Sequence, residues 1–159
     1  MIFIGGHSNL FSFWVIKDAE VLTLIFEAVE LLNKTSETIG LTRAYNILAS
    51  IYDNYGDYNA AIKYSQLAIK TAKENEFKEE EGDACTTLGQ IYSRLEDYNS
   101  AIEMLERGLN FREEANAQFA VSSSLNLIAR TFTLSQNYDK AIGYYNKSLE
   151  LRKSIGDQN

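Results

Sequence analysis

A 40-residue period constrains the fold of this chain more than any other feature of its sequence. An acidic or amide residue followed by tyrosine recurs in register, at Asp57-Tyr58, Asp97-Tyr98 and Asn137-Tyr138. Each pair leads into an Ala-Ile dipeptide, and a small residue followed by an aliphatic one comes seven positions later. Seven positions are about two turns of an α-helix. The period therefore predicts stacked copies of one helical unit.

The residues before each pair predict a second helix in every unit. A small residue at positions 49, 89 and 129 allows a neighbouring helix to approach closely, and an aromatic residue follows three positions later on the same face. Asp57, Asp97 and Asn137 precede the next helix, where their side chains can accept hydrogen bonds from unpaired backbone N–H groups. Each unit is predicted to be a helical hairpin with these three residues as caps.

The composition agrees with a folded, helical chain. The 159 residues include no proline, the main helix breaker, and 45% are hydrophobic against 23% charged. A chain of this length can bury a core as one domain. The predicted fold class is therefore all-α.

The segment Leu88-Gly89-Gln90-Ile91-Tyr92, followed by Asp97-Tyr98, Ala101 and a small residue at 108, resembles the tetratricopeptide repeat. The resemblance covers nearly the whole chain and implies a right-handed superhelical solenoid of antiparallel helix hairpins. Because the period is 40 rather than about 34 residues, we expect longer helices. Units of this length are similar to those of Pins/LGN-like scaffold proteins, kinesin light chains and bacterial signalling arrays.

The same frame divides residues 1–159 into units of a single domain. We expect a degenerate half repeat at 1–35, repeats at 36–75, 76–115 and 116–155, and the start of a truncated unit at 156–159. Residues 1–16 are expected to form only an imperfect helix. No polar helix follows the last repeat, so Ile142, Tyr145 and Leu149 are predicted to form an exposed apolar patch that could support a homo-oligomer.

Charge and residue counts exclude several classes of function. The formal net charge of −7 disfavours nucleic acid and anionic membrane surfaces as partners. One cysteine and one histidine supply neither a disulfide nor a soft-ligand metal cluster. No secretory signal or membrane span is evident in the sequence, and we expect a cytoplasmic protein.

No catalytic residue, metal site or cofactor is predicted, and we do not expect an enzyme. Cys85 occupies the position at which the tetratricopeptide repeat usually has tryptophan, so a buried core thiol is favoured over a reactive one. His7 is alone near a terminus and is expected at the surface or in disorder. The acidic run from Lys78 to Asp83 is interpreted as a solvated helix start rather than a metal site.

The remaining candidate is a binding surface. In the solenoid that the resemblance implies, the first helices line a concave groove, and the positions outside the packing slots face that groove. These predicted peptide-binding residues are Arg43, Asn46, Ser50, Asp53, Asp83, Thr86, Gln90, Ser93, Ser123, Asn126, Arg130 and Thr133. Amide side chains can bond a peptide backbone, and Arg130 can take a carboxylate in a bidentate pair.

We therefore expect a protein-protein interaction module that binds a partner peptide along the groove. The alternative is a regulatory or sensory segment of a larger bacterial signalling protein, such as a kinase, cyclase or regulator, that acts through peptide binding or dimerisation. A clamp for a chaperone's terminal carboxylate is disfavoured, because Asn46 and Ser50 do not supply the Lys and Asn that the resemblance would require.

Overall fold

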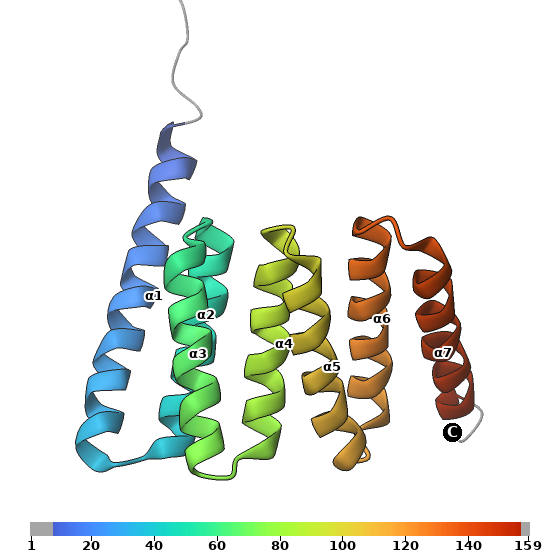
Figure 1. Ribbon diagram of the computed structural model, residues 1–159. Coiled ribbons are helices and arrows are strands. Elements are labelled where there is room, and N and C mark those ends of the chain that lie inside the picture. The colour runs from blue at the N-terminus through green and yellow to red at the C-terminus, as the bar shows by residue number, and fades with distance from the viewer. Residues whose placement is uncertain (1–7, 157–159) are drawn as a thin grey trace, which may run out of the picture.

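The computed structural model describes residues 8–156, with side chains from Glu20 onward. This part of the chain contains seven α-helices arranged side by side (Figure 1), and no strand. The helices are α1 (Ser8–Thr35), α2 (Thr38–Tyr55), α3 (Tyr58–Glu74), α4 (Lys78–Arg94), α5 (Tyr98–Glu114), α6 (Gln118–Leu134) and α7 (Tyr138–Gly156). The predicted all-α solenoid is confirmed.

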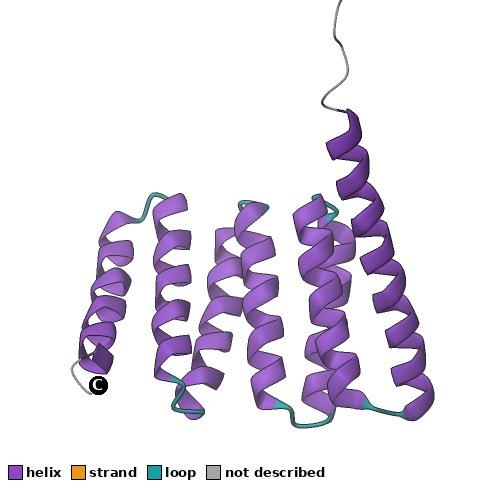
Figure 2. Ribbon diagram, turned by 180° about the vertical axis from the view of Figure 1, so that it is seen from behind, coloured by secondary structure: helices purple, strands orange, loops and turns teal. Residues whose placement is uncertain are grey.

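Helices α2 to α7 form three antiparallel hairpins joined by short loops (Figure 2), which fall within the three predicted 40-residue units. We call α2, α4 and α6 the first helices and α3, α5 and α7 the second helices. Each first helix contacts the next first helix, whereas the second helices of neighbouring hairpins do not contact one another within residues 8–156. The array therefore curves toward the first helices, which line its concave side.

The loops repeat every 20 residues. A residue with positive φ occurs at positions 36, 56, 76, 96, 116 and 136, and only Gly56 among them is a glycine. This left-handed residue reverses the chain direction where each helix ends. Asp97 then caps the next helix, because its Oδ1 accepts a hydrogen bond from the Ser100 backbone N–H at 3.2 Å. Asp57 and Asn137 accept equivalent bonds from Ala60 and Lys140, so all three predicted caps are confirmed.

The closest approach of two helices is at Gly89, as the sequence predicts. A Cβ atom there would lie 2.7 Å from Cγ of Leu105 and 3.0 Å from the carbonyl oxygen of Ala101. Only a residue without a side chain fits between α4 and α5 at this point. The core continues through α6 and α7 as a buried cluster of Leu105, Leu109, Val121, Leu125, Ile128, Phe132 and Ala141.

The two ends of the array differ from its interior. The N-terminal half repeat is one continuous helix from Ser8, so the imperfect helix expected over residues 1–16 is part of α1 from Ser8 onward. Residues 1–7 and 157–159 lie outside the described residues, and so do the predictions for His7 and for most of the truncated unit.

Helix α7 presents the predicted apolar patch. Ile142 is 58% exposed and Leu149 is 51% exposed, whereas Leu109, the equivalent of Leu149 in the preceding repeat, is 7% exposed. Helix α6 covers the equivalent face of α5. The patch is confirmed as exposed, and the self-association that we expect from it stays a prediction.

Candidate functional site

Nine of the twelve predicted groove residues are at least partly exposed, and three are buried. The buried residues Asp53, Thr86 and Ser93 correct the sequence analysis. Asp53 forms an ion pair with Arg94 at 2.7 Å, and the hydroxyl of Ser93 lies 3.5 Å from that of Thr131. In both cases the partner comes from the next first helix. Close contact between neighbouring first helices therefore removes these positions from the groove.

Thr86 is buried for a different reason. Its hydroxyl donates to the Gly82 carbonyl oxygen one turn earlier at 2.9 Å, and it packs against Gly108 of α5. The small residue at 108 thus leaves room for a threonine that points toward the second helix. The position is structural rather than available to a ligand.

Burial changes the ionisation of Asp53. Loss of hydration raises the pKa of this carboxyl group, and the attraction to Arg94 opposes the rise only in part. Its Oδ1 atom is buried without a hydrogen-bond partner within residues 8–156. The side chain is therefore engaged in holding α2 to α4.

The first pocket on the concave side lies between α2 and α4 and has a volume of about 340 Å³. Its lining residues are Thr42, Arg43, Asn46, Ile47, Glu79, Glu80 and Asp83. An ion pair between Nη2 of Arg43 and Oε1 of Glu80, 2.6 Å long, crosses from one helix to the other. The Oδ1 atom of Asn46 is buried and has no hydrogen-bond partner in the described structure. This pocket offers a free acceptor, but its arginine is already paired.

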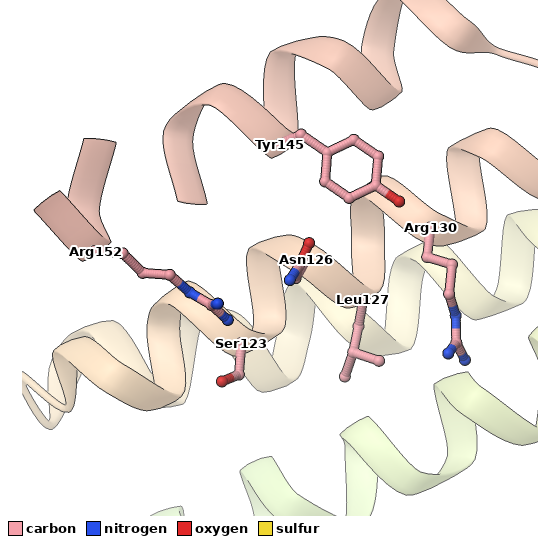
Figure 3. A pocket seen from close by; sticks show the side chains of 6 residues that line it. All are labelled: Ser123, Asn126, Leu127, Arg130, Tyr145 and Arg152. Atoms are coloured by element: carbon pink, nitrogen blue, oxygen red, sulfur yellow. The ribbon is translucent and has the colours of Figure 1, made fainter. Parts of the chain in front are cut away.

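The second pocket lies between α6 and α7 and has a volume of about 360 Å³ (Figure 3). Its lining residues are Ser123, Asn126, Leu127, Arg130, Tyr145 and Arg152. Asn126 stands 80 residues after Asn46, so the two asparagines occupy the same position of the repeat. The two pockets together are lined by six of the twelve predicted groove residues.

Sequence reasoning missed Tyr145 and Arg152 as pocket residues, because both belong to a second helix. The available signal was the period itself, since Arg152 stands 40 residues after Arg112. It also missed a hollow of about 460 Å³ between the second helices α3 and α5, whose apolar lining includes Ile69 and Met104. That hollow lies away from the first-helix groove.

The acidic start of α4 is not solvated as expected. Glu80 and Glu81 are 8% and 7% exposed, and they pair with Arg43 of α2 and Arg107 of α5, respectively. These carboxylates therefore tie α4 to both neighbouring helices. The prediction of a helix start is confirmed, and the prediction of a solvated one is wrong.

Cys85 is fully buried, which confirms the predicted core thiol. Burial raises its pKa to about 11, so the nucleophilic thiolate is strongly disfavoured at neutral pH. Across residues 8–156 no cluster of three or more His, Cys, Asp or Glu side chains is arranged to hold a metal ion. None of the helices described here is long and apolar enough to cross a membrane.

Comparison with solved structures shows the same architecture in several proteins. The crystal structure of aspartyl phosphate phosphatase F from Bacillus subtilis matches with a TM-score of 0.81 at 20% identity, covering 91% of this chain and 38% of that one. The apo form of RapI matches with a TM-score of 0.79 at 18% identity, over 89% of this chain and 39% of that one. MamA matches with a TM-score of 0.62 at 24% identity, over 87% and 74%. At these identities the likeness shows the fold, and the chain spans less than two fifths of the first two proteins.

Comparison with curated proteins found no match. The sequence pattern of the tetratricopeptide repeat, in contrast, matches residues 40–114 and again residues 124–158, which together exceed half of the chain. Arrays of this kind present extended surfaces to other proteins, and the chain is accordingly a protein-interaction module. With its hairpins, its helix caps and these two matches, the chain belongs to the tetratricopeptide repeat family.

Proposed function

We propose that the concave surface of the first helices binds an extended peptide segment of a partner protein. The observation that supports this most is the presence of two pockets on that surface, with asparagines at equivalent positions in the first and third repeats. A repeated amide is suited to a ligand that itself repeats, such as a peptide backbone. The function is therefore binding rather than catalysis.

The chemistry of the lining residues fits a peptide. The side chains of Asn46 and Asn126 can each donate to a backbone carbonyl and accept from a backbone N–H. The unpartnered Oδ1 atom of Asn46 is available for such an N–H. Each pocket is near the lower end of the size range of ligand sites and has room for a side chain or two of the bound segment.

The test is a peptide-display selection against the purified chain, run beside the variant that combines Asn126→Ala and Arg130→Ala. We expect peptides that bind the parent and lose most of their affinity for the variant. The free energy of unfolding of the variant is expected to stay within about 0.5 kcal/mol of the parent, as is usual for surface changes. Peptides that bind both proteins equally, or no enriched peptide at all, would contradict the proposal.

A further inference from the structure

Four of the six arginines of the chain form ion pairs. These pairs are Arg43 with Glu80, Arg94 with Asp53, Arg107 with Glu81 and Arg112 with Asp83. The other two, Arg130 and Arg152, have no carboxylate partner among the described residues, and both line the pocket between α6 and α7 (Figure 3). In a chain with a net charge of −7, the two uncompensated arginines meet in one pocket.

The repeat itself shows how this pocket differs. In the second repeat Nη2 of Arg112 lies 2.9 Å from Oδ1 of Asp83, which neutralises it. In the third repeat Arg152 takes the place of Arg112, but Ser123 takes the place of Asp83. The intramolecular partner is therefore replaced by a neutral hydroxyl group, and the charge of Arg152 is left without a carboxylate.

A second change adds charge to the same pocket. Arg130 occupies the position of Gln90 in the second repeat. It is exposed, and no hydrogen bond or ion pair holds it within residues 8–156. The third repeat has thus lost one negative charge and gained one positive charge at its groove positions.

The two arginines lie at opposite ends of the pocket. Nε of Arg152 donates to Oγ of Ser122 at 3.3 Å, which places it beside the first turns of α6. Arg130 comes eight residues after Ser122, about 12 Å along the helix axis. Figure 3 shows Asn126 between them and the ring of Tyr145 above. This arrangement suits two separate anionic groups, one at each guanidinium group.

We propose that the α6/α7 pocket binds a peptide segment carrying two carboxylates, one paired with Arg130 and one with Arg152. The inference rests on the proposed function and names the class of peptide. Guanidinium groups pair with carboxylates through two parallel hydrogen bonds, which gives both affinity and orientation. An extended peptide rises about 3.3 Å per residue, so carboxylates three or four residues apart span the pocket. The carboxylates come from Asp or Glu side chains or from the C-terminus of the partner.

The probes are two displayed libraries of random 12-residue peptides, one with the random segment internal and one with it at a free C-terminus. Each is selected against the parent and against the variant with Arg130→Gln and Arg152→Gln. Lys153→Gln is the matched control, because it removes one positive charge beside Arg152 without changing the pocket. Ser123→Asp is a second variant that restores the acid of the second repeat without removing either arginine.

We expect the parent and Lys153→Gln to enrich peptides with two acidic groups three or four residues apart, and the double glutamine variant to lose this preference. Synthetic peptides from the parent pool should bind the double variant and Ser123→Asp at least tenfold more weakly. Acid enrichment in the internal library identifies side-chain carboxylates as the source. Enrichment only when the C-terminus is free identifies the terminal carboxylate as one of the two groups.

Peptides that bind the groove without an acidic preference would overturn this inference and leave the proposed function standing. The same holds if the acidic preference persists in the double glutamine variant. If no peptide is enriched by any of the proteins, the proposed function fails and this inference fails with it.

Discussion

Arg112 and Arg152 occupy the same position in successive repeats, yet one is locked into the fold and the other is free. Arg112 bonds Asp83 at 2.9 Å and the hydroxyl of Ser124 at 2.5 Å, and its side chain is 19% exposed. Arg152 is exposed, and its recorded contact is a long hydrogen bond to Ser122. Two neighbouring copies of one structural unit therefore use the same residue for different purposes.

The difference teaches how a repeat array can separate stability from recognition. The second repeat has repeats on both sides, and its charges and small residues hold those neighbours together. The third repeat keeps the hairpin packing, including the close contact in which Ser148 Oγ donates to the Ser122 carbonyl oxygen at 2.8 Å. Its groove positions are then available for a ligand. The predictions below test this division.

The largest effect is expected at the glycine that allows α4 and α5 to approach. Gly89→Leu should destabilise the chain by about 3 kcal/mol, because the added side chain overlaps Leu105 and the Ala101 carbonyl group. Gly143→Leu in α7 is the control, because a Cβ atom there meets nothing within 4 Å. We expect that change to stabilise by up to about 0.8 kcal/mol through helix propensity. Chemical unfolding measures both, and equal midpoints would contradict the packing described.

The paired arginines provide the second test. Arg112→Gln should cost about 1–2 kcal/mol, since it removes two hydrogen bonds from a mostly buried side chain. Arg152→Gln should change the free energy of unfolding by less than about 0.5 kcal/mol. The measurement is urea unfolding of both variants and the parent. A loss at Arg152 as large as that at Arg112 would mean that Arg152 is structural.

The loops should not distinguish the two repeats. Glu96 and Gln136 have φ values of 62° and 60°, a conformation that strains residues other than glycine. Replacing either by glycine relieves the strain but loosens the unfolded chain, for a net stabilisation of about 0.5 kcal/mol. Thermal unfolding should show similar increases in Tm. A decrease, or a rise confined to one repeat, would contradict a shared loop geometry.

The smallest effect concerns the caps at low pH. Hydrogen bonds from the side chain and backbone of Ser100 lower the pKa of Asp97. Its stabilising contribution is therefore fully present above the pKa of about 3.9 in the unfolded chain, and it is lost as pH falls through the lower folded pKa. Urea unfolding of Asp97→Asn should lose this part of the acid dependence. Asn137→Asp should add an equivalent dependence in the third repeat, and an unchanged pH profile in both would refute the cap titration.

The sequence was enough to predict the hairpins, because the period, the caps and the small residues are all local signals. It did not predict the burial of Asp53 and Ser93, since their partners Arg94 and Thr131 come from a different repeat. Nor did it predict Arg152 as a pocket residue, because a second helix reaches the groove only through the angle and length of a particular side chain. Contacts between units are thus the part that the pattern of one unit cannot supply.

The most direct measurement is a titration of the 15N-labelled chain with the tightest-binding acidic 12-residue peptide from the selection, followed through the backbone amide signals. Binding as described predicts the largest shifts in residues 122–130 of α6 and 145–152 of α7, with smaller shifts along the concave faces of α2 and α4. Shifts concentrated at Ile69 and Met104, in the hollow between α3 and α5, would contradict recognition by the concave face.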